Sequence, residues 1–387
     1  MAAQMRVLLG GGCLAIAVFT VLPAPHPALS IVGLVATEWG HVVALVALTV
    51  LWPGWRHTVN GRLGGSLAIA AAALTLAPIL WAIPVARDLP ARLDAAFGPT
   101  PPSVFCGAPP RAEGLRVTDA LFGIRPRPAV AEELTYAVED DVSLKIRIQR
   151  SAAEGCPSPA PGVIVVEGPT WDAGADNSFN ALADYLVERG YGVVTIGHRP
   201  VPRWSHPDQS DDVRAAVAYV KASGQRLAID PNRLVLLGRS MQAHLALNAA
   251  YRQGAGAVRG VIALYPPADL LEAYDASTPI AASTRATLSD YLGGTPDEVP
   301  AVYDRPSAVN LAGPGSPPTL VIHGGRDGTF PLESSVQLDD RLARGGVRHL
   351  LVRLPWAQHG CDRNLSGPCG QISTYAIERF LAAILRR

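Results

Sequence analysis

Three long apolar runs dominate the first 86 residues, and short loops separate them. The runs cover residues 7–22, 31–52 and 63–85. A helix needs about 20 apolar residues to cross the hydrocarbon core of a bilayer, and the second and third runs reach that length. Neither carries the polar face that is typical of a helix on a soluble protein. We therefore expect residues 1–86 to form three transmembrane helices.

The first run leaves a second interpretation open. It is short for a span and also fits the apolar core of a cleaved signal peptide. We favour a span, because two further apolar runs follow at once and one helix bundle accounts for all three. Glu38 and His41 lie inside the second run, where an ionisable residue indicates either a functional role or a position near the membrane surface.

The arginines of the short loops predict the orientation in the membrane. Arg6 precedes the first run, and Arg56 and Arg62 lie in the loop before the third. The loop at 23–30 has no Lys or Arg. Since cytoplasmic loops are enriched in basic residues, the N-terminus and the second loop should be cytoplasmic. The chain after residue 86 is then expected on the extracytoplasmic side.

The polar and apolar pattern changes after residue 86. Residues 87–130 are rich in proline and predict a linker. From residue 131 to residue 387, short apolar runs typical of strands alternate with segments typical of helices. The expected strands are 134–138, 142–148, 162–166, 192–196, 234–237, 261–264, 319–322 and 349–353. This alternation predicts an α/β domain with a mainly parallel sheet and helices on both faces.

Composition narrows the class of protein. Lys plus Arg and Asp plus Glu both number 33, so the net charge gives no case for nucleic-acid binding. Four cysteines, Cys106, Cys156, Cys361 and Cys369, lie in the proposed external part, which is compatible with two disulfides. Of three pairings, Cys361 with Cys369 is the most local and would leave Cys106 with Cys156. Free thiols in a reducing compartment are the alternative.

A possible nucleophile follows the fifth expected strand. The apolar run 234–237 ends at Gly238, Ser240 lies two residues on, and a helix-prone segment comes next. A strand that turns sharply into a helix can hold a serine hydroxyl at the tip of the turn, usually with the pattern G-x-S-x-G. Here Gln242 takes the place of the second glycine.

The partners that a serine nucleophile requires follow in the order typical of such sheets. Serine needs an imidazole to accept its proton and an acid to orient that imidazole. Asp327 lies in the loop after the strand at 319–322, and His359 in the loop after the strand at 349–353. Loops at the carboxyl ends of parallel strands form the ligand sites of such sheets. Alone, Asp327 could be a turn residue and His359 a surface residue, but the order favours a catalytic triad.

From about residue 130 to the end, the chain resembles α/β-hydrolase carboxylesterases of the hormone-sensitive-lipase-like and feruloyl- or acetylxylan-esterase-like branch. The membrane part lies outside this resemblance. The matching segments are 163–171, 191–199, 211–217, 229–233, 238–246 and 291–294, with the loops of Asp327 and His359.

The resemblance implies roles for individual residues. Ser240 corresponds to the nucleophile, His359 to the general base and then acid, and Asp327 to the orienting acid. The backbone N–H of Met241 corresponds to one oxyanion donor. Gly168 and Thr170 stand where the family has its glycine-rich oxyanion loop.

The oxyanion loop departs from the family pattern. Glu167 replaces a histidine, and Pro169 and Thr170 replace glycines; proline has no N–H to donate. Loss of one oxyanion donor costs about 2.7–4 kcal/mol of transition-state stabilisation. Gln242 either disturbs the turn or offers its amide to the substrate, and Trp171 is expected at the mouth of the cleft.

The hypothesis that follows is a membrane-anchored serine esterase. It would cleave short-chain carboxylic esters of small molecules through an acyl-enzyme on Ser240, with the lipid bilayer as its other partner. A non-catalytic binding module of the same fold is the alternative, because Pro169 and Gln242 depart from the family pattern. No cofactor is expected, and no metal, since the histidines lack a spacing such as H-E-x-x-H.

Overall fold

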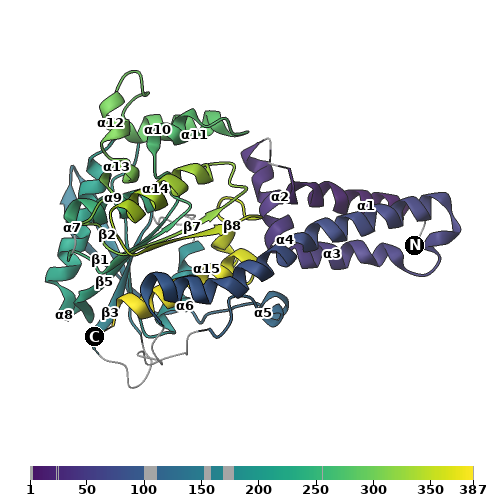
Figure 1. The fold of residues 1–387 in the computed structure, drawn as a ribbon, viewed down its shortest axis with the longest axis horizontal. Coiled ribbons are helices and arrows are strands. Elements are labelled where there is room, and N and C mark those ends of the chain that lie inside the picture. The colour runs from purple at the N-terminus through teal and green to yellow at the C-terminus, as the bar shows by residue number, and fades with distance from the viewer. Residues whose placement is uncertain are drawn as a thin grey trace.

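The computed structural model shows a helical arm that projects from an α/β body (Figure 1). It describes residues 3–22, 24, 26–99, 111–151, 158–168, 178–254 and 256–386.

The body is built on one eight-stranded sheet. Its strand order is β1-β2-β4-β3-β5-β6-β7-β8. The pairs β1–β2 and β2–β4 are antiparallel, and the other neighbours are parallel. The strands are β1 (Ala131–Glu139), β2 (Val142–Gln149), β3 (Ala160–Val166), β4 (Gly192–Ile196), β5 (Ile229–Arg239), β6 (Gly260–Leu264), β7 (Thr319–Gly324) and β8 (His349–Leu354). The predicted α/β-hydrolase fold with a mainly parallel sheet is confirmed.

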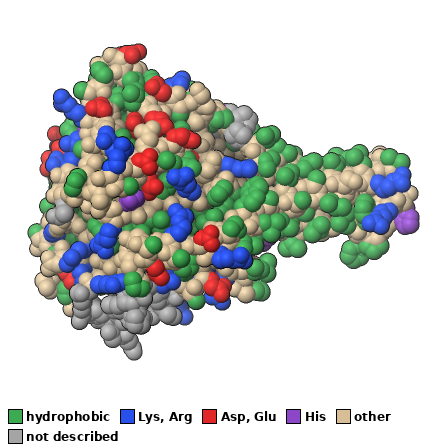
Figure 2. All heavy atoms as spheres, viewed as in Figure 1, with side chains coloured by type: hydrophobic (Ala, Val, Ile, Leu, Met, Phe, Trp, Pro, Cys, Tyr) green, Lys and Arg blue, Asp and Glu red, His purple; other side chains and the backbone are tan. Residues whose placement is uncertain are grey.

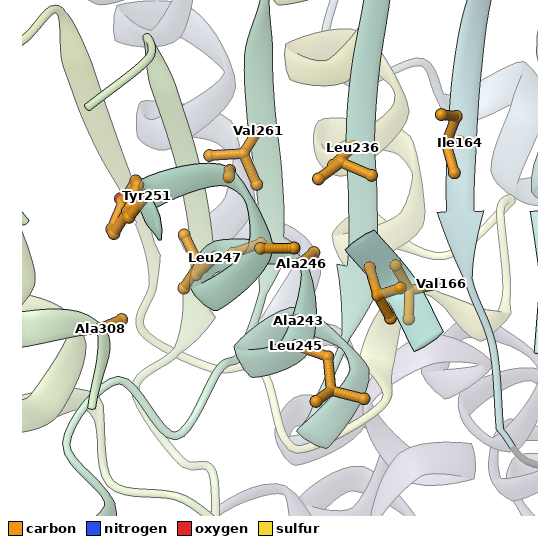
Figure 3. Close-up of a cluster of buried hydrophobic side chains, with 14 of the residues drawn as sticks. Ile164, Val166, Leu236, Ala243, Leu245, Ala246, Leu247, Tyr251, Val261 and Ala308 are labelled. Carbon is orange, nitrogen blue, oxygen red and sulfur yellow. The ribbon is translucent and has the colours of Figure 1, made fainter. Parts of the chain in front are cut away.

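Helices cover both faces of this sheet because alternate strand residues point to opposite sides. Ile164, Val166 and Leu236 pack against α7 (Asp208–Ala222), α9 (Met241–Gln253) and α14 (Leu332–Arg344). Figure 3 shows part of this cluster, with Ala243, Ala246 and Leu247 of α9 against the strands.

The opposite face carries a second core. Val163 and Val165 of β3 pack there with α6 (Ser178–Val187), α15 (Pro368–Ile384) and the C-terminal part of α4 (Val59–Phe97). Four short helices follow β6 in the chain: α10 (Leu270–Asp275), α11 (Ala281–Leu292), α12 (Pro300–Asp304) and α13 (Ala308–Leu311).

The arm contains the predicted apolar runs in a modified form. Its elements are α1 (Ala3–Ala17), η1 (Val18–Thr20), α2 (Pro27–Glu38), α3 (Gly40–Leu48), η2 (Thr49–Leu51), η3 (Trp55–His57) and the first half of α4. By length and composition, Ala3–Thr20 and Val59–Phe97 could each cross a membrane.

The second predicted run is broken rather than straight. Its two helices, Ala28–Glu38 and Gly40–Leu51, meet at an angle of 78°. Gly40 approaches α4 so closely that a Cβ there would lie 2.0 Å from the Thr75 carbonyl oxygen. Glu38, just before the bend, is fully buried against the body. The bend therefore joins a helix that packs along the arm to one that contacts the body.

The predicted linker also begins differently. We expected the third helix to end near residue 85, but α4 continues to Phe97 through Pro84 and Pro90. Leu89, Leu93 and Phe97 are buried in the core that α4 shares with α15. This burial offsets the loss of helical hydrogen bonds at the prolines. The arm and the body thus share one continuous helix of 39 residues.

Candidate active site

The turn after β5 holds Ser240 in a rare backbone conformation. Its φ of 56° and ψ of −131° lie outside the regions that non-glycine residues favour. A Cβ at Gly238 would come within 2.3 Å of the Gln242 carbonyl oxygen, so only glycine allows the helix to approach the strand this closely. The Ser240 N–H donates to the Leu264 carbonyl at 2.9 Å. The chain thus forms a sharp strand–turn–helix with Ser240 at its tip.

The structure brings Ser240, His359 and Asp327 together. Ser240 Oγ lies 2.9 Å from His359 Nε2, and His359 Nδ1 lies 2.8 Å from Asp327 Oδ2. The three side chains follow the carboxyl ends of β5, β8 and β7, which lie at the same edge of the sheet. The spacing and order match a serine that is hydrogen-bonded to an oriented imidazole.

Asp327 is held as a carboxylate. Its side chain is fully buried, and Oδ1 accepts the N–H groups of Thr329 at 2.8 Å and Phe330 at 3.0 Å. Burial alone would raise the pKa of Asp327, but attraction by His359 and the hydrogen bonds of His323 and His359 outweigh it. The pKa therefore lies well below its ordinary value. The carboxylate can orient the imidazole and stabilise it when protonated.

A buried network that the sequence analysis missed supports the other side of His359. The Tyr265 ring contacts the imidazole edge to face, with centroids 4.5 Å apart. Its hydroxyl donates to Asp362 at 2.7 Å, and Asp362 also pairs with Arg239 at 2.6 Å. Arg239 directly precedes Ser240, so the network connects the two loops of the site. The available signal in the sequence was the position of Arg239 next to Ser240 and of Asp362 shortly after His359.

The candidate oxyanion donors are only partly described. Met241 is the first residue of α9, so its N–H has no partner within the helix and lies at the positive end of the helix dipole. Gly168 is the last described residue at the start of the candidate oxyanion loop, and Thr170 and Trp171 lie outside the described residues. The Gln242 amide is next to Gly168, with Nε2 3.8 Å from the position of a Cβ there. Gln242 therefore faces the start of this loop.

In the described part of the chain, hollows of different size adjoin the loops of His359 and Asp327. A narrow opening of about 30 Å³ borders His359 directly. A larger cavity of about 560 Å³ borders Asp327 beneath α10, and it is lined by the acidic side chains Glu272, Asp275 and Glu333. Only the smaller one includes the imidazole that contacts Ser240. We therefore regard the small opening as the approach to the candidate nucleophile.

Part of the chain that contains this site matches a known protein family. Residues 151–342 match the family model described as BD-FAE. The matched segment, just under half of the chain, is thus similar to this family. Ser240 and Asp327 lie within the matched segment, and His359 follows it.

Two curated relatives of this chain are esterases by name. Esterase LipC of Mycobacterium tuberculosis is 30% identical over 249 residues, which cover 59% of this chain and 59% of LipC. The probable carboxylic ester hydrolase LipM of the same organism is 25% identical over 248 residues, or 58% of this chain and 54% of LipM. The chain thus spans somewhat more than half the length of these relatives.

A solved structure shares the fold. The bacterial heroin esterase superposes with a TM-score of 0.56 at 22% sequence identity, covering 67% of this chain and 86% of that chain. At this identity the likeness concerns the fold alone.

The loops of His359 and Asp327 are both hydrogen-bonded to the helical arm. Gln358 precedes His359, and its Nε2 donates to the Phe19 carbonyl oxygen at 2.8 Å. Arg326 precedes Asp327 and donates to the Thr20 carbonyl oxygen. The arm is therefore in direct contact with the site, which the sequence resemblance did not predict.

The disulfide predicted between Cys361 and Cys369 is confirmed. It closes the segment after His359. The Cys369 N–H donates to the Glu38 side-chain oxygen Oε2 at 3.1 Å, which connects this segment to α2. Cys106 and Cys156 lie outside the described residues.

A buried histidine lies one turn after Ser240 on α9. His244 Nε2 is 3.2 Å from the Tyr291 hydroxyl, which also lies 3.1 Å from His206 Nδ1. Burial, His206 and Arg252 lower the pKa of His244 to about 3.

Among the described residues, no group of three or more His, Cys, Asp or Glu side chains could hold a metal ion.

Proposed function

We propose that this protein is a serine hydrolase of carboxylic esters in which Ser240 is the nucleophile, His359 the general base and Asp327 the orienting acid. The hydrogen-bond chain of 2.9 and 2.8 Å from Ser240 to Asp327 carries this proposal. The esterase relatives LipC and LipM support the same class of reaction.

The geometry supports a two-step reaction. His359 Nε2 takes the Ser240 proton as Oγ attacks the ester carbonyl, and ionised Asp327 stabilises the imidazolium that forms. The Met241 N–H, with a donor from the loop after Gly168, would hold the negative oxygen of the tetrahedral intermediate. Its collapse passes the proton to the leaving alkoxide and leaves an acyl-enzyme. Water, deprotonated by His359, then releases the acid and restores Ser240.

The arm supports a multi-pass membrane anchor with the body outside the cytoplasm. Its surface is largely hydrophobic (Figure 2). The end farthest from the body holds Arg56 and His57 of η3, and Arg6 donates to the Pro53 carbonyl there at 3.2 Å. Basic residues at this end favour its placement on the cytoplasmic side.

Labelling of the nucleophile tests the enzymatic proposal. The full chain in lipid nanodiscs is treated with a fluorophosphonate, and the modified peptide is identified by mass spectrometry. We expect an adduct on Ser240 in the native protein and none in Ser240→Ala. Hydrolysis of a series of short-chain nitrophenyl esters should be lost in the same variant.

A binding module without catalysis is the second candidate, and the position of Gln242 beside Gly168 favours it. Folded protein that fails to label at Ser240 would support this candidate. The Pro169→Gly and Gln242→Gly double variant separates the two cases. An increased esterase rate in this variant means that the departures from the family pattern slow a working enzyme.

A further inference from the structure

The opening beside His359 is shared between the body and the arm. Ala24 and Ser30, from the turn between α1 and α2 and the start of α2, form one side of it. Ile280, just before α11, and Thr329 lie on the body side. The residues that belong to the candidate anchor thus line the approach to the candidate nucleophile.

The arm surface next to this opening is apolar. Leu22 is 57% exposed and Ile31 is 65% exposed, and each lies close in sequence to Ala24 or Ser30. In Figure 2 the hydrophobic surface of the arm continues up to the body. A continuous surface of exposed apolar side chains is more stable in contact with the hydrocarbon of a bilayer than in contact with water. The opening therefore lies where the bilayer that covers the arm would meet the body.

The body cannot turn this opening away from the membrane. Helix α4 runs without a break from the arm into the core of the body, where Phe97 packs edge to face on Phe380 with centroids 4.8 Å apart. Gln358 and Cys369 are bonded to Phe19 and Glu38 at two further points. Because these contacts lie on separate elements of the arm, they fix the orientation of the site relative to the anchor.

On the basis of the proposed esterase function, we infer that the substrate is an amphiphilic ester that resides in the bilayer. Its ester group would enter between Ser30 and Ile280 and reach Ser240, while its hydrocarbon part stays on the membrane side among the apolar residues of α1 and α2. This route avoids the transfer of each methylene of a long chain into water. The opening of about 30 Å³ must widen when the ester enters, so the side chains along it set the selectivity.

A pair of fluorogenic esters tests this inference. The full chain is placed in phosphatidylcholine nanodiscs. The substrate is either the acetate of an umbelliferone, supplied in the water, or a long-chain ester of the same umbelliferone, dissolved in the bilayer that holds the protein. We expect hydrolysis of the long-chain ester to rise with its mole fraction in the disc. The same ester supplied in separate, protein-free discs should be cleaved at least tenfold more slowly. Equal rates from the two kinds of disc would overturn the inference.

Substitutions at the opening give a second, independent readout. Ser30→Asp and Ile280→Asp place a charge on opposite sides of the opening, where it lies next to the hydrocarbon part of a bound long-chain ester and disfavours its binding. Each should lower the ratio of long-chain to acetate hydrolysis about tenfold. Ser283→Asp, on the exposed surface of α11, is the matched control and should leave the ratio within about twofold. An unchanged ratio in both opening variants would contradict the proposed route.

The two assays distinguish a wrong membrane route from a wrong esterase function. If the acetate is cleaved and Ser240 is labelled but the long-chain ester shows no dependence on the bilayer, only the membrane route is wrong. If neither ester is cleaved and Ser240 takes no label in folded protein, the esterase function itself is wrong and the route falls with it.

Discussion

Gln358 donates its side-chain amide to the carbonyl oxygen of Phe19 at 2.8 Å, across 339 positions of the chain. The acceptor lies in the last turn of the first apolar helix, and the donor is directly followed by His359. Arg326, directly followed by Asp327, bonds to the next carbonyl, that of Thr20. The two loops that hold the proposed base and acid therefore rest on the same turn of the arm.

Gln358→Ala should lower kcat for a short-chain ester about tenfold. Loss of the amide releases the loop of His359, and small displacements of a catalytic group have large effects on rate. The measurement is kcat and KM in nanodiscs, with KM expected to change little. Gln337→Ala is the matched control, since Gln337 bonds to Glu272 in an exposed position. A kcat equal to that of the control would mean that the arm does not position the loop.

Ser240→Gly and Ser240→Ala should separate catalysis from backbone strain. Both remove the hydroxyl, so the esterase rate should fall on the order of 10⁶-fold in each. Only glycine relieves the φ of 56° at this position, a strain worth about 1–3 kcal/mol. We expect the glycine variant to have the higher free energy of unfolding by about 1–2 kcal/mol, after the entropy cost of glycine. Equal stabilities in denaturant titrations would show that the turn is unstrained.

The sequence predicted those parts of the molecule whose signals are local. The apolar run at 162–166 coincides with most of β3, and Gly238 indicated the sharp turn at Ser240. Asp327 and His359 were predictable because parallel strands bring their carboxyl ends to one edge. Their distances could not be predicted, since only tertiary packing sets them.

Other features depended on contacts between distant segments. The bend at Trp39 is accompanied by the close packing of Gly40 on Thr75 of α4, a contact between distant segments that the sequence pattern does not show. The apolar run ends at residue 85 and the proline-rich stretch after it predicted a linker, but burial against α15 extends the third helix to Phe97. The contact of Gln358 with Phe19 likewise needs the folded body beside the arm.

His244 should make the body sensitive to acid. Its pKa is lowered to about 3 in the fold, so the unfolded chain binds a proton first as the pH falls below about 6.5. The stabilisation is complete above that pH and declines by roughly 1.4 kcal/mol per pH unit toward pH 3. Between pH 6.5 and 5, the free energy of unfolding should therefore fall by about 2 kcal/mol more in the native protein than in the His244→Gln variant. His57→Gln, exposed at the end of the arm, is the control and should leave the pH dependence as it is.

Phe97→Ala should destabilise the body although Phe97 lies on the helix that also forms the arm. The side chain is 4% exposed and packs on Phe380, so its removal leaves a cavity and should cost about 3–5 kcal/mol of unfolding free energy. Phe122→Ala is the matched control, because Phe122 is 77% exposed and should change stability by less than about 0.5 kcal/mol. Thermal unfolding in detergent, followed by near-UV circular dichroism of the body, measures both. If the two variants melt alike, the end of α4 is a tether rather than part of the core, and the fixed orientation of the site relative to the anchor is lost with it.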